Sequence, residues 1–343
     1  MAHHSVVQRL ETLLQTDVRI RRGLAEAVRA ANLPDIESID GYIAYLDALV
    51  ESIPSPDTLY PQIVKFYWIL KQEPARRIRA ESGVFRRWIA SFIEAWGTFL
   101  DTPESAKHIQ AFLDDPEFRI EEYDPGPSGW MTFNQFFALA IRPGMRPVAG
   151  RFDDRVIVAP ADSLYKTQVP IGDDATIVSK GVTYPIPSLL ADSAYARAFE
   201  GGTFMHAFLH VNDYHRYHVP VRGEVKDVRH ILGEVNLDVY QDAAGNLEAH
   251  AGVGHQFQQA RGLIIQDSPV GLVATLPIGM GQVSSVNVTP RVGSYLDKGE
   301  EFGYFLFGGS DIVILFQRGA ADLTVERDTH RKVGERIGTG VVR

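Results

Sequence analysis

Apolar residues recur every three or four positions through the first part of the chain, as they do on one face of an amphipathic helix. An early example consists of Val7, Leu10, Leu13, Leu14 and Val18. The longest stripe comprises Phe85, Trp88, Ile89, Phe92, Ile93, Trp96, Phe99 and Leu100. These patterns predict a helical domain over residues 1–125, and the longest stripe predicts a helix that packs on a core.

The segment Asp124-Pro125-Gly126-Pro127-Ser128-Gly129 interrupts this pattern, because its prolines and glycines cannot continue a helix. After it come short β-branched runs between glycines, at residues 156–158, 177–178, 219–221, 271–276 and 312–316. The polar segment 322–343 reads as a surface tail. We therefore predict an α+β chain with a helical domain at 1–125 and a β-rich domain at 130–343.

Composition narrows the range of functions. The chain has 343 residues, 45% hydrophobic and 22% charged, and carries a formal net charge of −9, which disfavours nucleic acid as a partner. It has no cysteine, which excludes disulfides and thiolate metal sites and is compatible with the cytoplasm. The apolar run at 66–70 is far shorter than the roughly 20 residues of a spanning helix. We expect no signal peptide and no membrane span.

One dipeptide carries candidate chemistry. Gly309-Ser310 lies between two apolar, strand-like runs, and a serine hydroxyl becomes a nucleophile when a base removes its proton. Attack on the Gly309 carbonyl would convert the peptide bond to an ester, and elimination and hydrolysis would leave a ketone, a pyruvoyl group, on residue 310. Most Gly-Ser dipeptides are simple turns, so the dipeptide alone establishes nothing.

Four histidines, His206, His210, His215 and His218, lie within thirteen residues. Clustered imidazoles can bind zinc, they can act as acids and bases, or they can be unrelated residues on strands and a loop. The sequence alone leaves these alternatives open. The chain has no His-Glu-x-x-His spacing, and we predict no metal site.

Asp162 follows Pro160-Ala161 at the end of a predicted strand. An aspartate in that position is most often a turn or cap residue. Its functional alternative is to orient an imidazole and to stabilise the cation that forms on it, as the acid of a catalytic triad does.

Together these pieces resemble the phosphatidylserine decarboxylase family of pyruvoyl enzymes. The most specific match is DYHRYHVPVRG at 213–223. The other blocks follow in the expected order: TFNQFF at 132–137 with RPGMRP at 142–147, PADS at 160–163, SKG at 179–181, GTF at 202–204, and KGEEFG at 298–303 followed by GGS at 308–310. Two departures stand out: the usual cleavage motif Leu-Gly-Ser-Thr is here Gly308-Gly309-Ser310-Asp311, and the usual glycine after the motif aspartate is Ser163.

The resemblance implies a role for each matched residue. The chain would cut itself between Gly309 and Ser310, and Ser310 would become the covalent pyruvoyl cofactor. His218 and Asp162 would activate Ser310, and His215 would assist decarboxylation or protonate the product. The ketone would hold the substrate amine as a Schiff base and accept the electrons that CO2 leaves behind.

The helical domain in front and the absence of an apolar anchor resemble the soluble branch that includes fungal L-tryptophan decarboxylases. We therefore expect a free L-amino acid as substrate, with an aromatic one such as tryptophan favoured. The alternatives are phosphatidylserine decarboxylation, which makes phosphatidylethanolamine, and a non-enzymatic carrier module that uses Lys298. The expected partners are the amino acid and the chain's own cleaved piece, and homo-oligomer formation stays open.

Overall fold

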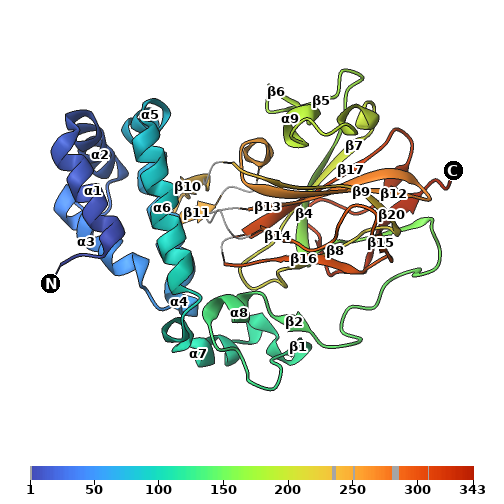
Figure 1. Ribbon diagram of the computed structural model, residues 1–343, viewed down its shortest axis with the longest axis horizontal. Coiled ribbons are helices and arrows are strands. Elements are labelled where there is room, and N and C mark those ends of the chain that lie inside the picture. The colour runs from blue at the N-terminus through green and yellow to red at the C-terminus, as the bar shows by residue number, and fades with distance from the viewer. Residues whose placement is uncertain (1, 234–236, 250–251, 280–285, 308) are drawn as a thin grey trace. The chain divides into compact units, whose positions relative to one another are not determined.

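The computed structural model describes the chain except for residues 1, 234–236, 250–251, 280–285 and 308, and for Gly309 and Ser310 it describes the backbone alone. Helices fill residues 5–99 and a β-rich region follows, which confirms the predicted α+β class (Figure 1). Contacts divide the chain into two compact units. The first combines 1–115, 128–136 and 236–250, and the second contains the rest. The domain bounds expected from sequence stay a prediction.

The first unit is built on six helices of nine or more residues, which are α1 (Ser5–Thr16), α2 (Val18–Ala31), α3 (Ile39–Val50), α4 (Pro56–Lys71), α5 (Glu73–Glu81) and α6 (Gly83–Phe99). Shorter helices follow at α7 (Ile109–Leu113) and α8 (Phe133–Phe137). None of the helices in the described residues has the length and apolar character that a membrane span requires.

The longest stripe forms α6, as predicted. Its Phe85, Trp88 and Phe92 are buried, and the indole of Trp88 donates to the Val6 carbonyl at 2.9 Å, which joins α6 to the start of α1. The early stripe was predicted one turn too far. Asp17 ends α1 and its carboxylate accepts from the first backbone N–H groups of α2, so Val18 begins a new helix and is 75% exposed.

A β-hairpin from the second half of the chain belongs to the helical unit. It consists of β10 (Val239–Gln241) and β11 (Leu247–Ala249). The hydroxyl of Tyr60 on α4 donates to Glu248 at 2.8 Å and accepts from the backbone N–H of Ala249 at 2.9 Å. Lys71, at the end of α4, pairs with Asp238 at 2.6 Å. The helical unit therefore holds a segment inserted between two strands of the other unit, β9 (Gly223–Ile231) and β12 (Arg261–Ser268).

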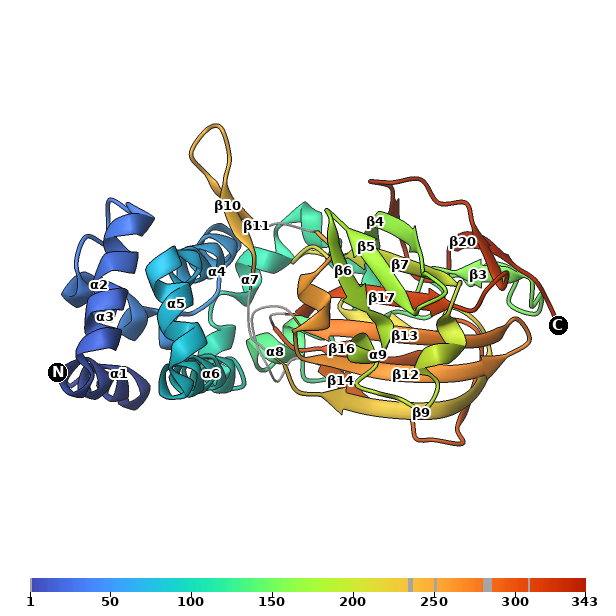
Figure 2. The same cartoon turned by 90° about the horizontal axis from the view of Figure 1, so that it is seen from above.

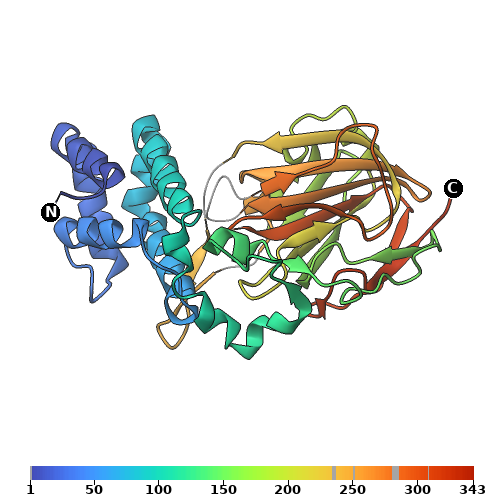
Figure 3. The same cartoon turned by 60° about the horizontal axis from the view of Figure 1, so that its bottom comes forward.

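The second unit is organised around an antiparallel eight-stranded sheet that curls on itself (Figures 2 and 3). Its strands, in spatial order, are β15 (Tyr295–Leu296), β9 (Gly223–Ile231), β12 (Arg261–Ser268), β13 (Gly271–Gly279), β17 (Gly309–Phe316), β7 (Thr203–Phe208), β4 (Ser163–Pro170) and β19 (His330–Arg331). The Gly309-Ser310 peptide thus opens a strand with a neighbour on each side.

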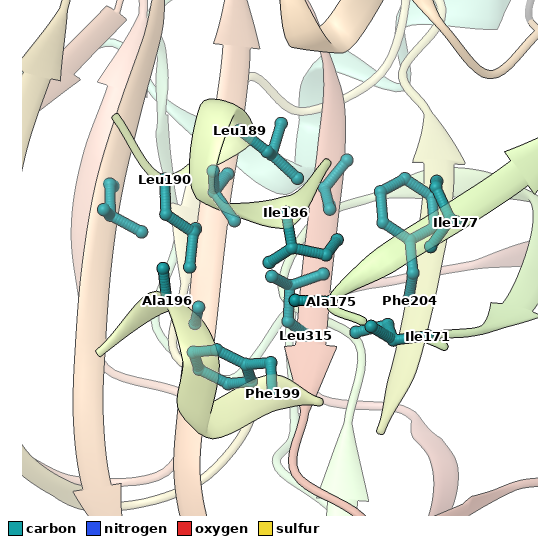
Figure 4. Close-up of a cluster of buried hydrophobic side chains, with 14 of the residues drawn as sticks. Ile171, Ala175, Ile177, Ile186, Leu189, Leu190, Ala196, Phe199, Phe204 and Leu315 are labelled. Carbon is teal, nitrogen blue, oxygen red and sulfur yellow. The ribbon is translucent and has the colours of Figure 1, made fainter. Parts of the chain in front are cut away.

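Smaller sheets complete this unit. They are β14 (Val286–Val288) with β16 (Glu301–Phe305) and β8 (Arg216–His218); β18 (Ala321–Leu323) with β20 (Arg336–Gly340) and β3 (Val156–Val158); β5 (Thr176–Ser179) with β6 (Val182–Pro185); and β1 (Tyr123–Asp124) with β2 (Ala140–Ile141). The short helix α9 (Ile186–Leu189) covers one face of the large sheet, where it packs with Phe199 and Phe204 on Val313 and Leu315 of β17 (Figure 4).

Two sequence-based predictions are wrong in detail. Residues 322–343 are not a tail, because β20 pairs with β3 and β19 pairs with β4, and Val333 and Ile337 are buried. Residues 219–221 form no strand. Pro220 has no N–H to give to a ladder, so this segment is an irregular link in which the Pro220 carbonyl accepts from Val158.

Candidate active site

The predicted cleavage dipeptide lies where the register of β17 changes. Gly309 pairs with Gly279 of β13, whereas Asp311 pairs with Ile278, so the ladder shifts by one residue beside Ser310. Such irregularities bend a strand locally and interrupt its regular hydrogen bonding. Gly308, the first residue of the predicted motif, lies outside the described residues.

His218, on β8, is held with one nitrogen ready to accept a proton. Its Nδ1 lies 2.9 Å from the Gly299 carbonyl, and its Nε2 lies 3.2 Å from the Tyr214 hydroxyl. A carbonyl can only accept, so Nδ1 carries the proton and Nε2 presents its lone pair. Gly299 has φ +78°, a conformation that side chains disfavour, which explains a glycine where the carbonyl must face His218. Burial lowers the pKa of His218.

His215 occupies apolar surroundings. The residue is 1% exposed, its ring stacks on Phe137 with centroids 3.9 Å apart, and Phe305 lies at 6.5 Å. Neither ring nitrogen makes a hydrogen bond of normal geometry with a described residue, although the backbone of Asp213 lies close enough to raise the pKa of His215 against burial. Burial lowers the pKa of His215 to about 4, so the imidazole is neutral at physiological pH. A buried imidazole with two unused nitrogens costs free energy, which is typical of a group kept for a ligand or for proton transfer.

Asp162 lies near His218 but bonds elsewhere. Its carboxylate accepts from Nε of Arg146 at 2.9 and 3.1 Å and from the backbone N–H of Val333 at 2.8 Å. None of its hydrogen bonds within the described chain reaches His218. The backbone N–H of His218 donates to the Pro160 carbonyl at 2.7 Å, which keeps the two segments adjacent. The role expected of Asp162 stays a prediction.

Arg146 lies beside Asp162, and the sequence indicated it only as part of the RPGMRP motif. Its side chain is 3% exposed and bonds Asp162 together with Glu122, whose carboxylate lies 2.8 Å away. The guanidinium also lies 5.7 Å from the ring of Tyr214, which contacts His218. A buried carboxylate needs a paired charge, and Arg146 supplies that charge to Asp162.

The four clustered histidines do not converge. His215 and His218 have the settings described above, His206 on β7 contacts Asp311 at 2.9 Å, and His210 lies after β7. Among the described residues, no group of three or more histidine, aspartate or glutamate side chains is arranged to hold a metal ion. Lys298, the candidate carrier lysine, is 3% exposed and donates to two backbone carbonyls, which does not suit a carrier arm.

The first residue of the DYH motif forms a separate ion pair. The Asp213 carboxylate accepts from His330 Nε2 at 2.7 Å and from the backbone N–H of His210 at 2.8 Å. The hydrogen bond that His330 donates to Asp213 raises the pKa of His330 above its ordinary value. This pair connects β19 to the loop that leads to His215 and His218.

The Asp213–His330 pair predicts a pH-dependent stability. Because the folded state raises the pKa of His330, the pair stabilises the fold fully below about pH 6.5, the ordinary histidine pKa, and its contribution is lost as pH rises through the folded-state value. We expect H330Q to unfold more easily than the wild type near pH 5.5, by up to about 1 kcal/mol. The difference should shrink near pH 8.5 in urea unfolding series. A difference that grows with pH would contradict this prediction.

Comparisons with known proteins agree with the resemblance noted in the sequence. The family model described as phosphatidylserine decarboxylase matches residues 133–339. A phosphatidylserine decarboxylase proenzyme of Fusobacterium nucleatum is 27% identical over 87% of this chain and 96% of that protein. Phosphatidylserine decarboxylase proenzyme 2 of Oryza sativa subsp. japonica is 31% identical over 71% of this chain and 40% of its own length. Decarboxylase iboD of Amanita muscaria is 30% identical over 68% of this chain and 77% of that protein.

Proposed function

Because the chain belongs to the phosphatidylserine decarboxylase family of pyruvoyl-dependent carboxy-lyases, we propose that it decarboxylates a free L-amino acid after cutting its own Gly309–Ser310 bond. The products are CO2 and a primary amine. The observation that carries the assignment is His215, a neutral, buried imidazole with two nitrogens that lack partners in the described part of the chain.

In the proposed maturation, the Ser310 hydroxyl adds to the Gly309 carbonyl carbon and the C–N bond breaks, which leaves an ester and a free amine. Removal of the proton on Cα of residue 310 then expels the Gly309 carboxylate. The remaining enamine takes up one water and loses ammonia, so residue 310 ends as a ketone. The cleaved peptide thus divides the chain into residues 1–309 and 310–343.

His218 fits the role of base in this process. Its proton lies on Nδ1, fixed by the Gly299 carbonyl, so its Nε2 can take up a proton. Burial lowers the pKa of His218, and against burial act the hydrogen bond to the Gly299 carbonyl, the charge of Glu301 and, after these, the carboxylate of Asp162. Arg146 holds that carboxylate in place.

The residues present fit a pyruvoyl group, because a serine stands at the start of β17 and the imidazole of His215, stacked on Phe137, keeps its nitrogens unused by the described residues. When formed, the ketone binds the substrate amine and takes up the electron pair that CO2 leaves. His215 would hold a proton on one nitrogen and hand it to the product carbon. Its apolar surroundings exclude water from that step.

The preference for a free amino acid has architectural support. The chain carries a helical unit ahead of the β-rich unit, and it is in this arrangement that it resembles the soluble branch. One similar protein is named a decarboxylase without mention of phosphatidylserine. The second candidate function is phosphatidylserine decarboxylation in a cytoplasmic or membrane-surface setting. It is supported by the names of the other similar proteins, which are phosphatidylserine decarboxylase proenzymes.

The substrate is tested by the CO2 released from tryptophan, from phenylalanine and from vesicles that contain phosphatidylserine. We expect release from a free amino acid, with tryptophan or phenylalanine above the vesicles at equal amino-group concentration. The S310A protein supplies the background rate. Release from the vesicles alone would overturn the free-amino-acid proposal while leaving the chain a decarboxylase.

A further inference from the structure

The residue that follows the proposed ketone is a buried acid with three side-chain nitrogens around one oxygen, and the Gln256 nitrogen among them also lies 3.2 Å from Nε2 of His206. Asp311 is 0% exposed, and its Oδ2 lies 2.6 Å from Nε2 of His255, 2.9 Å from Nε2 of His206 and 2.9 Å from Nε2 of Gln256. Its Oδ1 has no partner among the described residues. These four residues are called the Asp311 cluster below.

Three separate elements build the Asp311 cluster. His206 comes from β7, where it pairs with Val313 of β17, two residues beyond Asp311 and on the same face. His255 and Gln256 come from the 3₁₀ turn His255–Phe257, which is held to the sheet by stacking of Phe257 on Phe204, with centroids 6.4 Å apart. The cluster therefore lies on the same face of the sheet as Val313 and Phe204, which belong to the buried hydrophobic cluster.

The two histidines determine the direction in which the pKa of Asp311 is shifted. Burial alone would raise the pKa of Asp311, but the charges and hydrogen bonds of His206 and His255 outweigh burial and hold it below its ordinary value. Opposite Asp311, β13 presents Ile278 and β7 presents Phe208, both apolar. In the described part of the chain, the two histidines are thus the titratable groups in contact with the carboxylate.

A negative charge at Asp311 opposes the proposed self-cleavage. When the proton leaves Cα of residue 310, negative charge develops on that carbon and on the carbonyl joined to Asp311. Two like charges a few ångströms apart in a buried site repel each other strongly. The usual family residue here is threonine, which carries no charge, so this chain needs a counter-charge that the usual motif does not.

We propose that His206 and His255 are positioning residues for self-cleavage, which act by neutralising and fixing the Asp311 carboxylate beside the bond that breaks. This inference rests on the proposed function. His255 is the more accessible of the two, with 13% of its side chain exposed against 0% for His206. It is therefore the member of the pair that solvent can reach.

A double-mutant cycle tests the proposal. H255Q removes the imidazole that contacts Asp311, D311N removes the negative charge with little change of shape, and the double variant removes both. H230Q is the matched control, because His230 on β9 is exposed and outside the cluster. The first-order rate of self-cleavage of freshly folded chain is followed by intact mass spectrometry between pH 5.5 and 8.5.

We expect H255Q to slow self-cleavage about tenfold or more at pH 6. The added D311N change should return most of that loss, and H230Q should cleave like the wild type. D311N should change the pH profile of self-cleavage, because it removes the carboxylate that the two imidazoles contact. Equal slowing by H255Q in the wild-type and D311N backgrounds, or an unchanged pH profile in D311N, would overturn the proposal.

Two controls separate this inference from folding and from the proposed function. Each substitution is also made in an S310A background, where thermal unfolding reports folding alone. If the wild type never cleaves, the proposed function fails. If the wild type cleaves and the cycle is additive, only the role given to the two histidines fails.

Discussion

We expect S310A to leave the protein as one chain of about 38.1 kDa with no decarboxylase activity. Alanine has no oxygen to attack the Gly309 carbonyl, so neither the cut nor the ketone can form. The wild type, by contrast, should run as two pieces of about 34 and about 4 kDa, in proportion to residues 1–309 and 310–343. Intact mass spectrometry locates the break and detects the loss of the serine nitrogen as ammonia.

The comparison is decisive because it uses two readouts. A variant that stays whole and still releases CO2 would show that the electron-accepting group lies elsewhere. A wild type that stays whole after long incubation and is fully active would remove the self-cleavage proposal. G309A serves as a milder control, since it keeps the serine but crowds the carbonyl that is attacked.

H218A and H215A should fail at different stages. Without the base at residue 218, self-cleavage should slow by about 10²-fold to 10⁴-fold, the usual contribution of a general base. Loss of His215 should leave cleavage intact and reduce turnover of the processed enzyme by about 10²-fold or more. Gel analysis of the precursor and CO2 release from the processed protein measure the two stages separately.

H215F is the matched packing control. A phenylalanine keeps an aromatic ring against Phe137, so turnover lost in H215F comes from the missing nitrogens and not from a cavity. The same cleavage defect in H215A and H218A would mean that the division of roles between them is wrong.

Local patterns were sufficient for much of the fold. The stripe that includes Trp88 predicted α6 because one buried face is enough to specify a helix. The run at 312–316 predicted β17 because β-branched residues suit a strand with neighbours on both sides. Segment 322–343 was missed because its strands are two to five residues long and polar residues alternate with a few buried ones, such as Ile337.

The site was harder to predict than the fold. Ser310, His215 and His218 stand out through motifs, but their partners come from distant parts of the chain. Arg146 hydrogen-bonds Asp162, which is sixteen residues away in the sequence, and His255 contacts Asp311, which is fifty-six residues away. Such pairs depend on the register of strands that sequence does not reveal. A charged residue directly after the reactive serine was the one local signal that pointed to the Asp311 cluster.

The β10–β11 hairpin is bonded to the helices through Tyr60 and Lys71, so we expect the helices and the hairpin to be kept or lost together in evolution. Its second strand ends at Ala249, and only five residues separate that strand from His255 in the 3₁₀ turn. A descendant that lost the helices would leave Val239, which is now fully covered, facing water. We therefore expect recombined relatives to contain both the β10–β11 hairpin and the helices, or neither.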